Sequence, residues 1–116
     1  MTGQLKRIAA VLASLDIGRT VGFCEGRLGF RCVAQHEDYA IFQRDEVSVH
    51  YWLCSDRYIA QNTSCYVYVS DARSLYAEYE AQGIIHPNGP LRQQPWGLEF
   101  AVLDLDGNLY KFCEPN

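Results

Sequence analysis

The side chains best suited to chemistry in this sequence are aromatic rings and an imidazole that alternate with apolar residues along two short stretches. They are His50 and Trp52 in the stretch 47–53, and Tyr66 and Tyr68 in the stretch 64–69. Successive side chains of a β-strand point to opposite faces, so each stretch is expected to place its rings on one face. Rings with polar tips stack on planar ligands and hydrogen-bond to them. The pattern predicts a small-molecule site, although the same rings could fill a core or a subunit interface.

The strands that position these rings belong to a plan that occurs twice in the chain. Each half has a strand, a helix capped by an aspartate and ended by a glycine, and then three strands. Asp16 and Asp71 are the predicted caps, and Gly29 and Gly83 end the two helices. The predicted strands are 5–15, 30–35, 39–44, 47–53, 64–69, 100–103 and 109–113. Residues 84–94 are expected to form a long loop, either without regular structure or with short strands near 84 and 91.

This plan predicts an α+β fold in which two βαβββ modules form a curved, mostly antiparallel sheet with helices on the outer face. The opposite face is then free to form a cleft. We expect one domain over residues 1–116, with module one at about 5–54, module two at about 61–114, and a polar connection at 56–62.

The C-terminal stretch is predicted to be a hairpin with a tryptophan at its entrance. Pro95 and Gly97 bracket Trp96, a pattern that ends one segment and starts another. The turn at 104–108 consists mainly of Asp, Gly and Asn, which bond back to the backbone or tolerate positive φ. The chain is therefore expected to reverse there.

Composition argues against several classes of protein. The chain has 116 residues, 48% of them hydrophobic, and a formal net charge of −4, which disfavours nucleic acid as a partner. No run approaches the roughly 18 apolar residues of a membrane span, and the N-terminus lacks the apolar core of a signal peptide. A cytoplasmic location without membrane contact is expected. The five cysteines include no C-x-x-C pair and are expected to be reduced, structural thiols.

Three segments resemble the bleomycin-resistance proteins of the vicinal oxygen chelate superfamily, which also contains glyoxalases and extradiol dioxygenases. The main one is 95–108, and 27–30 and the pair 67–69 and 75–79 fit the same family. The resemblance implies paired βαβββ modules and a homodimer with ligand clefts at the subunit interface. Ala10 stands where members often have a proline that supports exchange of the N-terminal arm between subunits.

Enzymes of this superfamily hold a divalent metal with four side chains, two from each module. The corresponding places here are Ala9, Ser64, Lys111 and one around His50. Alanine cannot coordinate, serine is a poor ligand, and lysine brings a positive charge to a cation site. We therefore expect no metal, no cofactor and no catalytic residue. The alternatives are a metal-dependent lyase or dioxygenase of the same fold, and a small-molecule-sensing or purely structural module.

In the drug-binding branch that this sequence resembles, flat rings of the ligand stack on cleft aromatics and its cationic groups meet acidic side chains. The resemblance therefore implies sequestration of a planar, cationic antibiotic such as a bleomycin-type drug. The expected ligand-binding residues are Tyr39, His50, Trp52, Tyr66, Tyr68, Trp96, Asp38 and Asp56, with Glu37 as a further acid. The alternative roles are core or dimer packing for the rings and plain solvated charge for the acids.

Overall fold

Each half of the chain folds into a strand, a helix and three further strands. A computed structural model describes residues 3–116. The elements of the first half are β1 (Ala10–Ser14), α1 (Ile17–Phe23), a π-helical turn η1 (Cys24–Leu28), β2 (Arg31–Gln35), β3 (Tyr39–Arg44) and β4 (Val47–Leu53). The elements of the second half are β5 (Ser64–Tyr68), α3 (Ala72–Ala81), β6 (Arg92–Gln94), β7 (Gly97–Leu103) and β8 (Leu109–Pro115). A short helix, α2 (Arg57–Ala60), connects the two halves.

The strands form two four-stranded sheets, and each sheet takes its strands from one half of the chain. The orders are β1-β4-β3-β2 and β5-β8-β7-β6. In each sheet one pair at an edge is parallel, namely β1–β4 and β5–β8. The remaining pairs are antiparallel. The predicted α+β class with mostly antiparallel pairing is confirmed, with the refinement that each module has a sheet of its own.

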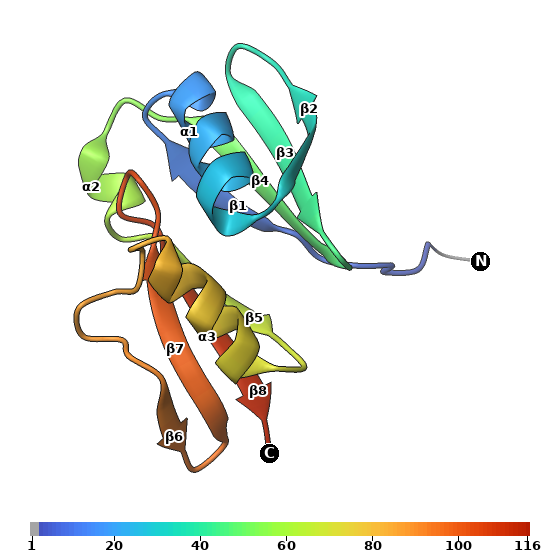
Figure 1. The fold of residues 1–116 in the computed structure, drawn as a ribbon. Coiled ribbons are helices and arrows are strands. Elements are labelled where there is room, and N and C mark those ends of the chain that lie inside the picture. The colour runs from blue at the N-terminus through green and yellow to red at the C-terminus, as the bar shows by residue number, and fades with distance from the viewer. Residues whose placement is uncertain (1–2) are drawn as a thin grey trace.

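The two main helices cover the same side of their sheets, and they begin and end as their residue types predict. In Figure 1, α1 lies in front of the first sheet and α3 in front of the second. The carboxylate of Asp16 accepts a hydrogen bond from Arg19 N, and that of Asp71 from Ser74 N, each at 3.0 Å. Gly29 ends the first helical segment with φ +74°, a conformation that costs a glycine little.

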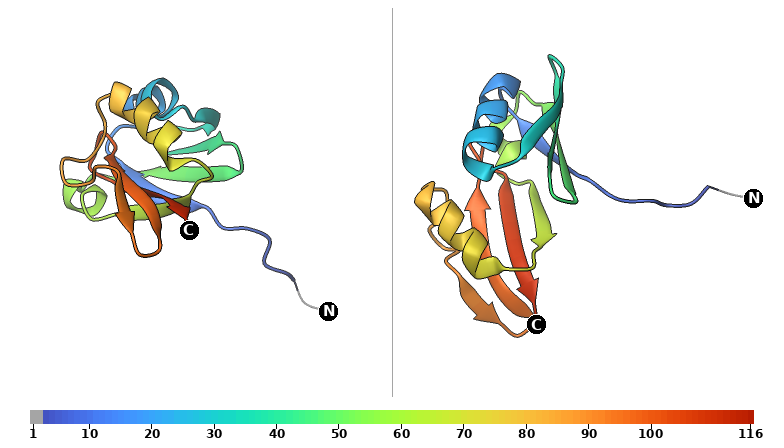
Figure 2. Two further views of the ribbon diagram at one scale, coloured as in Figure 1. Left: turned by 60° about the horizontal axis from the view of Figure 1, so that its bottom comes forward. Right: turned by 45° about the vertical axis from the view of Figure 1, so that its right-hand side comes forward.

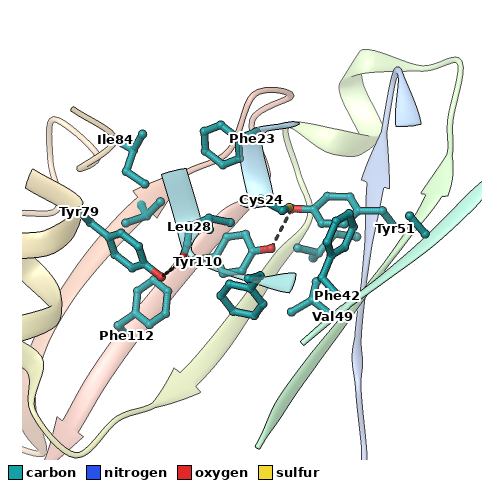
Figure 3. Packing of buried hydrophobic residues seen from close by; sticks show 14 of the residues in the cluster. Phe23, Cys24, Leu28, Phe42, Val49, Tyr51, Tyr79, Ile84, Tyr110 and Phe112 are labelled. Atoms are coloured by element: carbon teal, nitrogen blue, oxygen red, sulfur yellow. Dashed lines mark hydrogen bonds between the residues drawn. The ribbon is translucent and has the colours of Figure 1, made fainter. Parts of the chain in front are cut away.

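One hydrophobic core lies beneath both helices and extends across the two modules. Figure 3 shows residues of the first module, such as Tyr51 and Phe42, beside residues of the second, such as Tyr110 and Phe112. The hydroxyl groups of Tyr51 and Tyr110 lie 2.8 Å apart and are hydrogen-bonded. Burial raises the pKa of both phenols well above the usual range, so both stay neutral.

The Asp and Asn side chains of the turn at 104–108 are buried against the first module. Asn108 is fully buried, and its amide pairs with both the N–H and the carbonyl of Ala13 in β1, at 3.2 and 2.7 Å. Leu15 N donates to Asp106 at 2.9 Å, and the Tyr51 hydroxyl donates to Asp104 at 2.6 Å. The predicted turn therefore also joins the two modules.

The N-terminal strand and the connection between the modules differ in detail from the prediction. The strand predicted at 5–15 covers only Ala10–Ser14, because its pairing with β4 begins at Ala10 opposite Val49 and ends at Ser14 opposite Leu53. Figure 2 shows residues 3–9 extending away from the rest of the molecule. The connection predicted at 56–62 contains α2, because the Asp56 carboxylate accepts from Tyr58 N at 2.9 Å and caps a helical turn. No helix within residues 3–116 has the length and apolar character needed to cross a membrane.

Candidate functional site

The open face of the first sheet, opposite α1, carries three of the predicted ring-bearing residues. Tyr39 in β3 lies opposite Trp52 in β4, and its hydroxyl is 2.8 Å from Nδ1 of His50. The Tyr39 and His50 rings meet edge to face, with centroids 5.5 Å apart. The core face of β4 carries Val49 and Tyr51, both buried, while Trp52 remains 36% exposed. Alternation along β4 thus places these rings as predicted.

The open face of the second sheet carries the other three rings. Tyr66 and Tyr68 in β5 lie edge to face with centroids 5.3 Å apart, and Trp96 stands in the turn between β6 and β7. Tyr68 is 69% exposed and Trp96 56%, so each offers much of its surface to a ligand or a partner. Position 97, directly after Trp96, requires a glycine because a Cβ at this position would lie 2.5 Å from the Glu114 carbonyl oxygen of β8. The glycine lets the hairpin strands approach closely beside the exposed indole.

Glu99 in β7 links these second-face residues, and the sequence reasoning missed it. Its Oε2 accepts hydrogen bonds from the Tyr66 hydroxyl and, at 3.0 Å, from the Trp96 indole N–H. Lys111 Nζ lies 3.6 Å from its Oε1. Burial alone would raise the pKa of the Glu99 carboxyl, but these donors outweigh it and hold the pKa below its usual range. Glu99 is therefore ionised at neutral pH.

Glu99 was missed because the predicted strand started too late to include it. The predicted strand began at residue 100, whereas β7 begins at Gly97. Pairing the hairpin about the turn sets Ala101 opposite Lys111 and Glu99 opposite Cys113. This register places Glu99 and Lys111 as diagonal neighbours on one face.

The predicted acids stand in connecting segments next to the strands β3 and β4 that carry the rings of the first face. Asp56 caps α2, as described above, and the backbone carbonyl of Asp38 accepts from Leu53 N at 2.8 Å in the turn between β2 and β3. Glu37 lines a shallow cavity of about 340 Å³ together with His36 and Asp16. The side-chain hydrogen bonds described for residues 3–116 do not join Asp38, Asp56 or Glu37 to a ring of either face.

The structure brings the six predicted rings together in two groups of three, one on each sheet. A larger cavity of about 450 Å³ lies between the modules next to α3, and it is lined by residues such as Phe30, Leu75 and Phe112. Of the ring residues only Tyr68 contributes to it. On its rim Arg44 forms an ion pair with Glu78 at 2.7 Å and donates to the Leu28 carbonyl at 2.9 Å. The aromatic faces therefore share only Tyr68 with this cavity.

The four places expected for metal ligands do not form a cluster of donors. Ala9 precedes β1, Ser64 opens β5 opposite Leu109, and Lys111 lies opposite Tyr66. His50 has Tyr39 as its hydrogen-bond partner. Within residues 3–116, no three His, Cys, Asp or Glu side chains lie close enough to hold a metal ion.

Solved structures of drug-binding proteins share this fold. The bleomycin-binding protein from bleomycin-producing Streptomyces verticillus, solved with copper(II)-bleomycin, matches with a TM-score of 0.83 and 28% identity over 97% of this chain and all of that one. The bleomycin resistance determinant encoded on the transposon Tn5 matches with a TM-score of 0.84 and 25% identity over 97% of this chain and 99% of that one. The paired modules are thus those of the bleomycin-binding, glyoxalase-type fold.

Sequence comparison identifies the family. The chain is 33% identical over 117 aligned positions to bleomycin resistance proteins of Geobacillus stearothermophilus and Staphylococcus aureus, covering 85% of this chain and 89% of theirs. No protein-family model matches it. The chain belongs to the bleomycin resistance protein family, which confirms the resemblance found in the segment 95–108.

Proposed function

We propose that this protein binds a bleomycin-type drug on its two aromatic faces and sequesters it without chemical change. The observation that carries the proposal is the placement of six polar-tipped rings on the open sides of the sheets, in a chain of this family. Two related structures, at 28% and 25% identity, were solved with copper(II)-bleomycin and with bleomycin. Each ring stacked on a planar drug contributes about 0.5–1.5 kcal/mol beyond its burial, so several rings together support tight binding.

We propose that the binding form is a homodimer with two clefts. The two ring groups of one chain belong to separate sheets, so a second copy is needed to enclose a ligand between faces. Val11, which lies opposite His50 in the first sheet, is 51% exposed, and Ile8 in the N-terminal segment is 94% exposed. Large exposed apolar patches are uncommon on monomers, and twofold dimers are the commonest way to cover them. The expected mass in solution is about twice the 13.2 kDa of one chain.

Residue chemistry supports binding rather than catalysis. Ala9 has no donor atom, and Lys111 places an ammonium group where the enzymes of this fold would hold a cation. His50 is left as a hydrogen-bonding group beside Tyr39. The cytoplasm remains the expected location, and Asp38 and Asp56 remain expected contacts for a cationic part of the drug.

Titration with metal-free bleomycin, followed by tryptophan fluorescence and calorimetry, tests this function. Trp52 and Trp96 are the only tryptophans, so binding should change the emission and saturate at two drugs per dimer. Trp52→Phe and Trp96→Phe should each weaken binding, whereas Tyr58→Phe, an exposed tyrosine on α2, should not. A protein that binds no bleomycin at micromolar concentration, or chemically alters the drug, would refute the proposal.

A further inference from the structure

A single carboxylate oxygen fixes two exposed rings that come from different elements. Tyr66 belongs to β5 and Trp96 to the turn between β6 and β7, yet both donate to Oε2 of Glu99 in β7. Glu99 itself is only 6% exposed, whereas Tyr66 is 41% and Trp96 56% exposed. The anchor is therefore buried while the rings it holds are accessible.

Both oxygens of the Glu99 carboxylate already have partners within the protein. Lys111 of β8 neutralises Oε1, and Oε2 already accepts from both rings. The other groups that face it are Arg92 of β6 and Cys113 of β8, its partners on the neighbouring strands. A cationic part of a drug would thus meet an occupied carboxylate beside an ammonium group. This surface suits the flat, uncharged part of a ligand.

We infer that Glu99 is a positioning residue of the proposed drug site, holding the Tyr66 and Trp96 rings so that they contact the drug by their faces. The polar tips of both rings are turned toward Glu99, so neither tip needs a partner on the ligand. A ring that is already fixed loses less conformational freedom when a ligand stacks on it. This inference rests on the proposed function, because it names how one half of that site recognises its ligand.

The variant Glu99→Gln tests the inference, since it keeps the shape of the side chain and removes the charge. Its matched control is Glu80→Gln, a carboxylate exposed on the outside of α3. We expect Glu99→Gln to weaken binding of metal-free bleomycin by about tenfold, on the scale of one stacked ring, and the control to bind like the wild type. Equal binding by Glu99→Gln and the wild type would overturn the inference.

Coupling to the rings separates positioning from a general effect on stability. Tyr66→Phe keeps the ring and removes its hydroxyl, so the hydrogen bond from Tyr66 to Glu99 is already lost in that variant. The double variant with Glu99→Gln should therefore bind more tightly than the product of the two single losses predicts. Strict additivity would show that Glu99 does not act through Tyr66.

A measurement without drug tests whether Glu99 holds the Trp96 ring. The indole N–H resonance of Trp96, assigned with Trp96→Phe, should shift with pH and report a carboxyl pKa below the ordinary 4.5. Glu99→Gln should abolish this titration. A wild-type resonance that stays still from pH 6 down to the lowest pH at which the protein is folded would overturn the inference even if Glu99→Gln failed to fold. If the resonance titrates but bleomycin does not bind, the anchoring stands and the proposed function fails.

Discussion

Replacing Asn108 by alanine should destabilise the protein strongly without touching either aromatic face. The Asn108 side chain makes three buried hydrogen bonds, two to the backbone of Ala13 and one to Asp104 at 2.8 Å. Its backbone N–H also donates to Asp104 at 2.8 Å, and the alanine variant keeps this bond. The variant therefore removes the two bonds that join the C-terminal turn to Ala13 of β1 and the side-chain bond to Asp104.

The expected loss follows from the groups that are left without partners. The N–H and the carbonyl of Ala13, which is fully buried, would both lose the Asn108 amide. Leaving a buried polar group unpaired costs about 1–3 kcal/mol, so two such groups predict a loss of about 2–6 kcal/mol. The total stability of a domain is about 5–15 kcal/mol, so the loss is a large part of it.

Urea unfolding at one fixed protein concentration, followed by circular dichroism, measures this loss. The matched control is Asn62→Ala, whose amide makes one exposed bond to the Tyr58 carbonyl at 2.8 Å. The control should change the free energy of unfolding by less than about 0.5 kcal/mol. A loss below about 1 kcal/mol for Asn108→Ala would show that water or a backbone shift replaces the amide, and the reasoning would be wrong.

The structure predicts the outcome of three further experiments. Gly97→Ala should lower the melting temperature, because its Cβ would lie 2.5 Å from a backbone oxygen of β8; an unchanged value in a thermal scan would contradict this close approach. Arg44→Met should cost about 1 kcal/mol near pH 7, the scale of a partly exposed pair. Its hydrogen bond to Glu78 lowers the pKa of that carboxyl from 4.5, so the part of the cost due to this pair should be fully present above pH 4.5 and be lost as the pH falls through the lowered pKa; a cost that did not shrink in acid in urea unfolding would refute the pairing. Burial raises the pKa of the Cys65 thiol to about 12, so a thiol reagent should modify Cys65 near pH 8 only after unfolding, as peptide mapping would show.

The placement of individual rings could be predicted because it depends on local alternation. In β4 and β5 the side chains alternate between core and open face, and the sequence shows that period directly. His50, Trp52, Tyr66 and Tyr68 therefore lie on the faces expected for them. The helix caps were predictable for a similar reason, since each bond joins residues three apart.

Contacts between distant segments could not be predicted in this way. Glu99 and Tyr66 are 33 positions apart, and the bonds between Asn108 and Ala13 join positions 95 apart. Alternation gives the face on which a side chain lies but not the strand that pairs beside it. Tyr66 and Trp96 meet at a glutamate that was not predicted, and this meeting depends on the order β5-β8-β7-β6, which is a property of the assembled sheet.

The turn at 104–108 illustrates how one set of residues can satisfy two requirements. Asp, Gly and Asn favour a chain reversal, and this local reason sufficed to predict the turn. The same side chains lie buried between the modules, where Asp104 accepts from Tyr51 and Asn108 pairs with Ala13. They thus contribute to the angle between the two sheets, and with it to the relative placement of the aromatic faces. A substitution in this turn can therefore alter drug binding although none of its residues belongs to either ring group.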